Sequence, residues 1–279
     1  MGHNLLKGKK GIIFGALDSK SIAWKVAEHA HSEGAKLVLS NAPIALRMGT
    51  INELAEKIES KVISADATSM DDLRALYEGA MKELGGKIDF VLHSIGMSVN
   101  VRKGRKYYEQ NYDWNMKGYD VSALSFHKTM QAAWELDALN EWGSVVGLSY
   151  IAAQRVFHTY NDMADNKAML ESIARSFGYH YGLRRKVRVN TISQSPTDTT
   201  AGSGVGGFDG FYRFANDLSP LGNASADDCA EYCVSLFSDY TRKVTMQNLF
   251  HDGGFSFTGM SETAMDTYLK MMEEEKKGK

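Results

Sequence analysis

The 279-residue sequence contains only two cysteines and three prolines. Cys229 and Cys233 stand four residues apart in a segment of helical periodicity, which fits packing better than a disulfide framework. A reducing cytoplasm is therefore the expected compartment. Because no Pro/Ser-rich linker divides the chain, we expect residues 1–279 to form a single domain.

The sequence also lacks a strong excess of charge and a long apolar run. Its formal net charge is −2, which argues against a nucleic-acid partner and against a polybasic membrane surface. No run of apolar residues is long enough to span a bilayer, so we expect no membrane association. No group of histidine, cysteine or carboxylate residues has metal-ligand spacing, so we expect no catalytic metal. Small molecules or proteins are the expected partners.

Short apolar runs alternate with longer segments that have the period of a helix. Strands buried on both faces and separated by helices must run parallel. The chain is therefore predicted to be an α/β protein, a Rossmann-like doubly wound parallel sheet of about seven strands with helices on both faces. The charged tail at 273–279 is expected to be a solvated, frayed end. The expected strands are 11–14, 36–39, 61–64, 88–93, 144–148, 187–192 and 248–251, and the main expected helices are 21–33, 51–59, 71–84, 121–136 and 226–236.

Tyr160 and Lys167 are the first candidates for catalytic chemistry. From Tyr160 onward, apolar residues recur every three or four positions, which predicts an amphipathic helix carrying both side chains. Seven residues make roughly two turns, so both side chains leave one face about 10 Å apart along the axis. A phenol beside a lysine suits a site where negative charge develops on a carbonyl oxygen. The alternative is an ordinary pair on a surface helix.

Three strand ends carry residues that suit a dinucleotide. Gly15 ends the first strand, and Ser21 is predicted to cap the next helix, whose N-terminus attracts anions. This turn lacks the three-glycine fingerprint, so a plain helix cap is the alternative. Asp66 follows the third strand, where a carboxylate can accept the adenine amino group. The sequence from His93 to Gly96 follows the fourth strand, where glycine admits a ribose to the backbone.

The order of these motifs resembles the short-chain dehydrogenase/reductase superfamily. Most of that superfamily separates its tyrosine and lysine by three residues. Here six residues separate Tyr160 from Lys167, and Tyr150 stands ten positions before Tyr160. This spacing resembles the bacterial NAD(P)H-dependent enoyl-acyl-carrier-protein reductases, with similarity from about residue 5 to residue 257. The motifs that carry the resemblance are Gly15 with 21–23, Asp66, 93–96, 148–150, Tyr160 with Lys167, 187–190, Ser195-Pro196 and 252–255.

The resemblance implies that the protein reduces the trans-2 double bond of an enoyl thioester on acyl carrier protein, with NADH or possibly NADPH. It implies that Tyr160 donates a hydrogen bond to the enolate oxygen and that Lys167 binds the nicotinamide ribose. Tyr150 matches the second active-site tyrosine, or else is a packing aromatic. The implied cofactor-binding residues are Gly15, Ser21, Ile22, Asp66, Ala67, Ser94, Ile95, Gly96, Lys167, Thr197 and Thr199, and the implied substrate-binding residues are Met97, Tyr150, Tyr160, Phe208 and Phe211.

Two stretches depart from the family pattern. After the second strand, the sequence Ser40-Asn41-Ala42-Pro43 offers neither an acid for a ribose hydroxyl nor a basic pair for a 2′-phosphate, so the cofactor preference stays open. A basic, aromatic stretch lies between Gly96 and Val121. Its charge would suit docking of an acidic carrier protein, but a solvated surface loop is the favoured interpretation. The residues that give it this character are Arg102, Lys103, Arg105, Lys106, Tyr107, Tyr108, Tyr112 and Trp114.

Two further expectations concern substrate access and assembly. The glycine-rich segment around 197–216 is expected to be a mobile flap whose Phe208, Phe211, Tyr212 and Phe214 cover an acyl chain. A homotetramer is expected, because the resemblance is to tetramers and the apolar stretch from 255 to 269 needs cover.

Two rival functions remain at this stage. One is a carbonyl or 3-oxoacyl reductase of the same superfamily, against which the spacing of Tyr160 and Lys167 argues. The other is a non-catalytic dinucleotide-sensing protein, which both intact side chains make less favoured.

Overall fold

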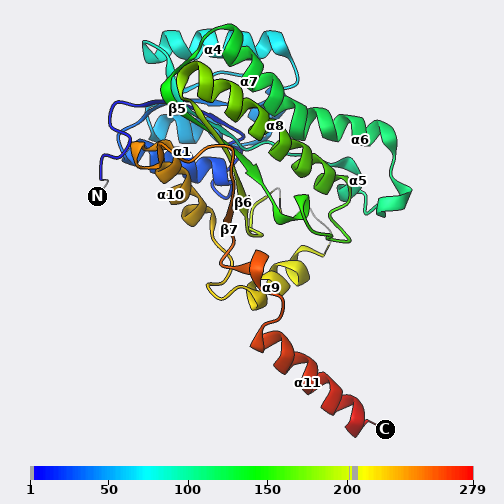
Figure 1. The fold of residues 1–279 in the computed structure, drawn as a ribbon. Helices are drawn as coiled ribbons and strands as arrows, with labels where there is room; N and C mark the ends of the chain where they lie inside the picture. Colours follow the sequence, from blue (N-terminus) through cyan, green and yellow to red (C-terminus); the bar gives the residue numbers. More distant parts are fainter. Residues whose placement is uncertain (1–2, 201, 203–206, 279) are drawn as a thin grey trace.

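In the computed structural model, which describes residues 3–200, 202 and 207–278, seven parallel strands form one sheet (Figure 1). The strand order is β3-β2-β1-β4-β5-β6-β7. This confirms the predicted doubly wound α/β fold. The strands are β1 (Lys10–Phe14), β2 (Lys36–Ser40), β3 (Lys61–Val62), β4 (Ile88–His93), β5 (Leu139–Ser149), β6 (Arg188–Gln194) and β7 (Asn248–His251).

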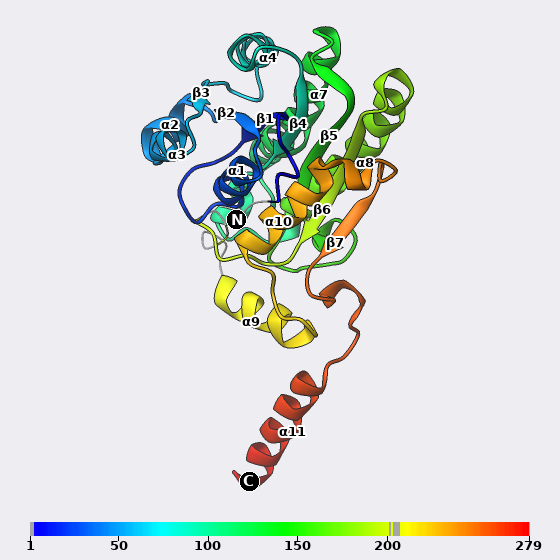
Figure 2. The same ribbon diagram turned by 90° about the vertical axis from the view of Figure 1, so that its left-hand side faces the viewer.

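Helices cover both faces of the sheet (Figure 2). Successive strand residues point to opposite faces, so Ile13 packs into one core and Ile12 into the other. Apolar residues are therefore needed at consecutive positions, which explains the unbroken apolar runs in the sequence. The first core lies under α1 (Ile22–Ser32), α3 (Ile51–Lys57) and α10 (Ala226–Phe237), and the second lies under α4 (Met70–Leu84), α7 (Ser125–Glu135) and α8 (Asp162–Arg185).

The strand order reverses between β1 and β4, which are neighbours in the sheet. Gly15, directly after β1, has φ +95°, and a Cβ atom there would stand 2.1 Å from the Ser94 carbonyl oxygen. Only glycine therefore lets the two strand ends approach this closely. Ligands of open α/β sheets bind in the crevice that such a reversal opens.

Tyr160 does not lie on the helix that carries Lys167, contrary to the prediction. The helix α8 begins at Asp162, and Tyr160 lies in the preceding turn, where its N–H donates to the Phe157 carbonyl oxygen at 3.0 Å. Asn161 has φ +48° and caps the helix, its side chain accepting a hydrogen bond from the Asp162 N–H at 2.7 Å. Because a residue at positive φ does not have helical backbone geometry, the helix cannot extend back through Asn161 to Tyr160, as the apolar period alone suggests.

The stretch from Gly96 to Val121 lies at the surface, as predicted, but much of it is helical and it is not a plain loop. It forms α5 (Val99–Arg102), the 3-10 turn η1 (Tyr107–Glu109) and α6 (Tyr112–Tyr119), which continues through the π-helix η2 (Asp120–Leu124) into α7. Ser98 and Asn111 cap α5 and α6 by accepting hydrogen bonds from backbone N–H groups. Ser21 was also expected to cap its helix, but its hydroxyl donates instead to the Asp18 carbonyl oxygen at 2.8 Å.

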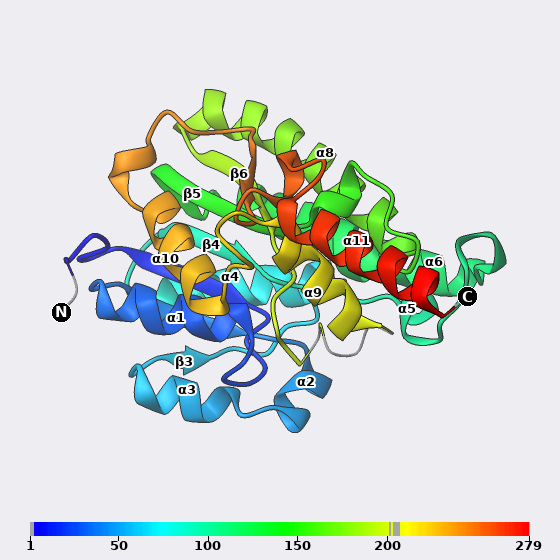
Figure 3. The same ribbon diagram turned by 90° about the horizontal axis from the view of Figure 1, so that it is seen from below.

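The C-terminal helix α11 (Glu262–Lys277) extends away from the rest of the chain (Figures 1 and 3). The predicted frayed end at 273–279 is therefore helical as far as Lys277, and within the described residues it is exposed as expected. The remaining elements are α2 (Pro43–Met48), η3 (Ile151–Ala153), α9 (Phe208–Leu218), η4 (Asp239–Thr241) and η5 (Phe255–Phe257).

Candidate active site

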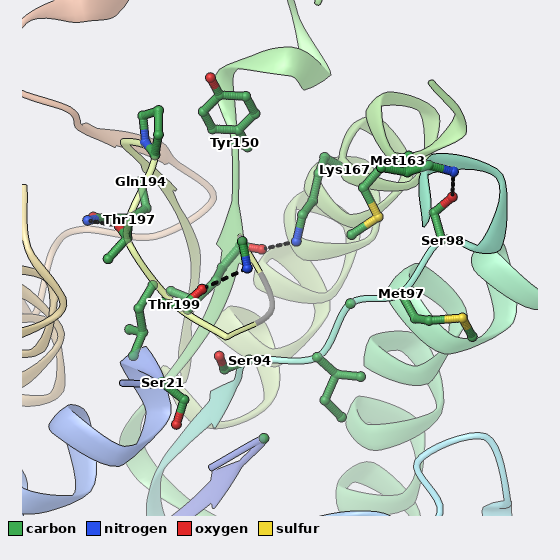
Figure 4. A pocket seen from close by; sticks show the side chains of 18 of the residues that line it. Ser21, Ser94, Met97, Ser98, Tyr150, Met163, Lys167, Gln194, Thr197 and Thr199 are labelled. Atoms are coloured by element: carbon green, nitrogen blue, oxygen red, sulfur yellow. Dashed lines mark hydrogen bonds between the residues drawn. The ribbon is translucent and has the colours of Figure 1, made fainter. Parts of the chain in front are cut away.

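A cavity of about 420 Å³ opens at the carboxyl ends of the strands, where the strand order reverses (Figure 4). Its wall combines the β1–α1 turn, the segments after β4, β5 and β6, the start of α8, and α9. The structure thus brings together residues far apart in the sequence. The predicted site residues that line the cavity are Gly15, Ser21, Ile22, Ser94, Ile95, Gly96, Met97, Tyr150, Tyr160, Lys167, Thr197, Thr199, Phe208 and Phe211.

Asp66 and Ala67, both predicted to bind the cofactor, do not line this cavity. The strand β3 ends at Val62, so Asp66 lies four residues beyond it. The Asp66 carboxylate accepts hydrogen bonds from the N–H and the hydroxyl of Thr68, at 2.9 and 2.7 Å. Ala67 is buried in the core next to α4.

Sequence reasoning missed several lining residues. Asn41 and Gln194 stand at the ends of β2 and β6, so the rule that ligands collect at strand ends would have found them. The apolar residues beside the tyrosines carried no such signal. The further lining residues are Leu17, Asn41, Ala45, Ser98, Val101, Arg102, Leu148, Ser149, Phe157, Thr159, Met163, Gln194, Ser195, Pro196, Thr200 and Gly202, of which Leu148, Ser149, Ser195 and Pro196 belong to the motifs quoted above.

Lys167 reaches the cavity from α8 and is buried. Its Nζ donates a hydrogen bond to the Leu148 carbonyl oxygen at 2.7 Å (Figure 4). Burial lowers the pKa of Lys167 to about 8, while the Glu171 carboxylate acts to raise it. A Cβ atom on Gly96 would stand 2.7 Å from the Met163 methyl carbon and 3.8 Å from Nζ, so glycine keeps the space before the ammonium open.

Tyr150 and Tyr160 lie side by side, with ring centroids 5.1 Å apart. Tyr150 is also packed against Phe157 and Phe211. Within the described residues its buried hydroxyl has no hydrogen-bond partner, and such a group favours a ligand that supplies one. Burial raises the pKa of both tyrosines, so both are neutral phenols that can donate a hydrogen bond at pH 7.

Behind Lys167 lies a second buried polar group. Glu171, one turn further along α8, accepts hydrogen bonds from the Ser149 hydroxyl at 2.6 Å and from the Gln154 amide at 3.3 Å. Burial raises the pKa of Glu171. The arrangement fixes the end of β5, which carries both Ser149 and the carbonyl that binds Lys167.

The other end of the cavity offers backbone donors. The first N–H groups of α1 have no partner within the helix, and Ile22 at that end lines the cavity. Such a helix end binds phosphate groups well. The Thr197 hydroxyl donates to the Ser195 carbonyl oxygen at 3.0 Å, and the Thr199 hydroxyl accepts from the Gly202 N–H at 3.0 Å. These bonds fix the chain after β6 against the cavity.

The described residues contain neither a metal-binding cluster nor a membrane-spanning helix. They contain no group of three or more histidine, cysteine or acidic side chains placed to hold a metal ion. Nor does any helix among them have the length and apolar character needed to cross a membrane.

Comparisons with known proteins show the family of this chain. The family described as "Enoyl-(Acyl carrier protein) reductase" matches residues 15–256. The enoyl-[acyl-carrier-protein] reductase [NADH] 2 of Rhizobium meliloti is 32% identical over 92% of this chain and 95% of its own. The FabI–NADH complex from Alistipes finegoldii is 64% identical, with a TM-score of 0.94 over 95% of this chain and 94% of that one. FabI from Candidatus Liberibacter asiaticus is 30% identical, with a TM-score of 0.86 over 94% of this chain and 100% of that one. This chain therefore belongs to the enoyl-(acyl carrier protein) reductase family.

Proposed function

We propose that this protein reduces the trans-2 double bond of an enoyl thioester on acyl carrier protein, with NADH as the electron donor. The observation that carries the proposal is the meeting of Tyr150, Tyr160 and Lys167 in one cavity at the reversal of the strand order. Family membership and relatives whose names specify NADH support the reaction and the cofactor.

The residues present fit a dinucleotide. Backbone donors at the start of α1 suit a pyrophosphate, and the open space at Gly96 beside the Lys167 ammonium suits a ribose with its two hydroxyls. We assign the carboxamide to the backbone of Thr197 and the pyrophosphate contact also to Thr199. When bound, NADH supplies the hydride that is added to the β-carbon of the substrate.

The chain's own residues then serve the charge that develops on the thioester oxygen. Tyr160, a neutral phenol, donates a hydrogen bond to that oxygen as it becomes an enolate. The Lys167 ammonium adds positive charge from a buried position, where electrostatic interactions are screened less than in water. The Tyr150 hydroxyl is buried and has no hydrogen-bond partner among the described residues, and its ring lies 5.1 Å from the Tyr160 ring between centroids, so it is a second donor.

One experiment tests the reaction and its rivals together. The purified protein is given a trans-2-enoyl thioester or a 3-oxoacyl thioester, each with NADH or NADPH, and oxidation of the cofactor is followed. Oxidation with the enoyl substrate alone is the expected result. Turnover of the 3-oxoacyl thioester alone would identify a carbonyl reductase, and no turnover of either would favour a sensing protein.

The names of the relatives support NADH, and the residues after β2 offer no binding site for the 2′-phosphate of NADPH. The Asn41 side chain donates to the Ala16 carbonyl oxygen at 3.0 Å and accepts from the Ala42 N–H at 2.9 Å, so it holds the β1 and β2 ends together. No basic pair for a 2′-phosphate stands beside it in the sequence. The same assay measures the preference, and equal kcat/KM with NADPH would overturn it.

A covering segment around 197–216 is also part of the proposal. Ala201 and residues 203–206 of this segment lie outside the described residues. In the described part, Phe208 and Phe211 line the cavity from α9, which supports a role in covering the acyl chain. Proteolysis within 197–216 should slow when cofactor and a substrate analogue are bound, and an unchanged cleavage rate would contradict this.

Two further proposals concern the number of subunits and the cellular compartment. We propose a homotetramer, for which the exposed apolar residues of α11 are the support. We also propose the cytoplasm as the compartment, which cell fractionation would test.

A further inference from the structure

A basic and aromatic patch covers α5, the turn after it, η1 and the start of α6. We define this patch by Arg102, Lys103, Arg105, Lys106, Tyr107, Tyr108 and Tyr112, all of which are exposed. The side chain of Tyr108 is 78% exposed and that of Tyr112 is 80% exposed. Exposed tyrosine and arginine together are typical of residues that anchor protein interfaces.

The charges of the patch are not neutralised by the chain itself. Among the described residues, none of its four basic side chains forms an ion pair with a carboxylate. Arg105 lies over the Trp114 ring and Lys106 over the Tyr108 ring, at 5.8 Å from each centroid. The segment 99–119 has five basic and two acidic residues in a chain whose net charge is −2. The positive charge is therefore concentrated here.

The patch begins at the rim of the cavity. Arg102 lines the cavity and is also exposed to solvent, while its neighbour Val101 lines the cavity and is buried. The cavity wall formed by α9 differs in charge, because α9 has two acidic residues and only Arg213 as a base. Arg213 lies 3.8 Å from the Asp217 carboxylate. The α9 residues that line the cavity are Phe208 and Phe211, so the basic side of the rim is the one at α5.

A buried polar network holds the patch in place. Asp162, the first residue of α8, accepts hydrogen bonds from the Ser98 hydroxyl at 2.5 Å and from the Asn100 amide at 3.1 Å. Asn161 donates to the Arg105 carbonyl oxygen at 2.7 Å. The patch is thereby fixed to the start of the helix that carries Lys167, so that a partner bound to it has a set position relative to the site.

We propose that this patch docks the acidic carrier protein and aims its thioester arm past Arg102 into the cavity. The inference rests on the proposed function, which requires a substrate attached to such a carrier. Complementary charge raises the rate of encounter and orients the partner. A second copy of this chain is a poor occupant, because a two-fold contact through the patch would place its positive charges against each other.

The test compares Lys103→Glu/Lys106→Glu with a matched control, Lys36→Glu/Lys82→Glu. Neither Lys103 nor Lys106 lines the cavity. The control lysines are exposed, form no ion pair within the described chain and lie at the opposite end of the sheet, at the start of β2 and the end of α4. Each variant is assayed with one enoyl chain attached either to the carrier protein or to N-acetylcysteamine, a small uncharged thiol, at low and high salt.

For the patch variant we expect KM with the carrier substrate to rise about tenfold or more at low salt, with kcat little changed. Its KM for the small thioester should match the wild type, which also shows that the variant is folded. Carrier protein without an acyl chain should inhibit the wild type and the control competitively, and the patch variant only weakly. High salt should raise the wild-type KM for the carrier substrate towards that of the variant.

The assays distinguish a failure of the docking site from a failure of the proposed reaction. Equal KM values for the carrier substrate in the patch and control variants, with normal turnover, would overturn the docking site and leave the reaction standing. Failure of the wild type to reduce either enoyl substrate would overturn the proposed function itself.

Discussion

At the scale of single residues, the proposed reaction gives the two tyrosines one shared task. If Tyr160 serves the developing enolate, Tyr160→Phe should lower kcat while the affinity for NADH stays close to that of the wild type. Loss of a hydrogen bond to an oxyanion costs roughly 3 kcal/mol, or about a hundredfold in rate. The measurement is steady-state turnover of an enoyl thioester together with NADH binding by fluorescence.

Tyr150 is close enough to compensate in part, because the two rings are 5.1 Å apart between centroids. We therefore expect Tyr150→Phe/Tyr160→Phe to lose more activity than either single change. The loss in activation free energy should differ from the sum of the two single losses, because the residues are in contact. Unchanged turnover in the double variant, with NADH binding intact, would show that neither phenol takes part in the reaction.

Lys167 sets the expected dependence on pH. With its pKa at about 8 in the ligand-free protein, the side chain is mostly cationic at pH 7 and mostly neutral at pH 9. The kcat/KM for NADH should therefore fall as the pH rises through 8, because this ratio reports the free enzyme, in which Lys167 has this pKa. His93 adds no such change, because burial and the nearby Lys167 charge lower its pKa to about 3.

Substitution separates the lysine charge from other causes. In Lys167→Arg the guanidinium stays charged, so the decline above pH 8 should disappear, although its different shape lowers the rate at every pH. Lys167→Ala should weaken NADH binding and slow turnover together, because a ground-state contact and transition-state charge are both lost. A decline above pH 8 that persists in Lys167→Arg would assign it to another group.

The sequence predicted these three residues from their spacing, but it misjudged how Tyr160 is held. The apolar period gives no sign of the positive φ of Asn161, which separates Tyr160 from the helix that begins at Asp162. Asp66 was a candidate because of an expected strand as far as 64, whereas β3 ends at Val62. The residue at which a strand ends depends on its pairing with the adjacent strands, and the sequence of that segment alone does not reveal this pairing.

At the scale of elements, the contact between the ends of β1 and β4 is the tightest point of the site. Gly15→Ala places a Cβ atom 2.1 Å from a backbone oxygen at φ +95°. We expect the free energy of unfolding to fall by at least about 1–3 kcal/mol, the cost of a strained backbone position. NADH binding should weaken as well, because Gly15 lines the cavity.

Gly210→Ala is the matched control for this change. Gly210 lies inside α9, and an added Cβ atom there meets nothing within 4 Å. Because Gly210 lies in the first turn of α9, alanine there should stabilise by less than the roughly 1 kcal/mol of a helix interior. Urea unfolding of both variants gives the comparison, and equal stability of Gly15→Ala and the wild type would contradict the assigned role of Gly15.

Elements with a strong apolar period were predictable, and those held by polar contacts were not. All seven strands and the helices that cover the sheet follow from runs of apolar residues whose burial is the main driving force of folding. The helices α5 and α6 depend instead on the caps Ser98 and Asn111 and on buried amides such as Asn100 and Asn115. The two caps are local, but Asn100 also donates to the Asp162 carboxylate, which comes from a distant part of the chain. The sequence of the stretch alone does not reveal that partner.

At the scale of the whole molecule, we expect two surfaces of a single chain to be covered by other copies. On α11, the side chains of Tyr268, Leu269 and Met272 are 62%, 52% and 53% exposed. The second surface is a groove between α7 and α8, where the half-buried Trp134 and Phe177 lie among polar residues. A tetramer with two-fold symmetry needs at least two distinct self-complementary surfaces, and we propose these two for it.

We therefore expect sedimentation at micromolar concentration to give about four times the chain mass of 30.9 kDa. Leu269→Glu/Met272→Glu should shift the protein towards smaller species, because it places charge in a surface that must lose water to form a contact. Thr263→Glu/Thr267→Glu adds the same charge to polar positions of the same helix and should leave the mass unchanged. A wild-type protein that sediments as a monomer would contradict the assembly, whereas equal masses for wild type and both variants would move the interface away from α11 and towards the groove between α7 and α8.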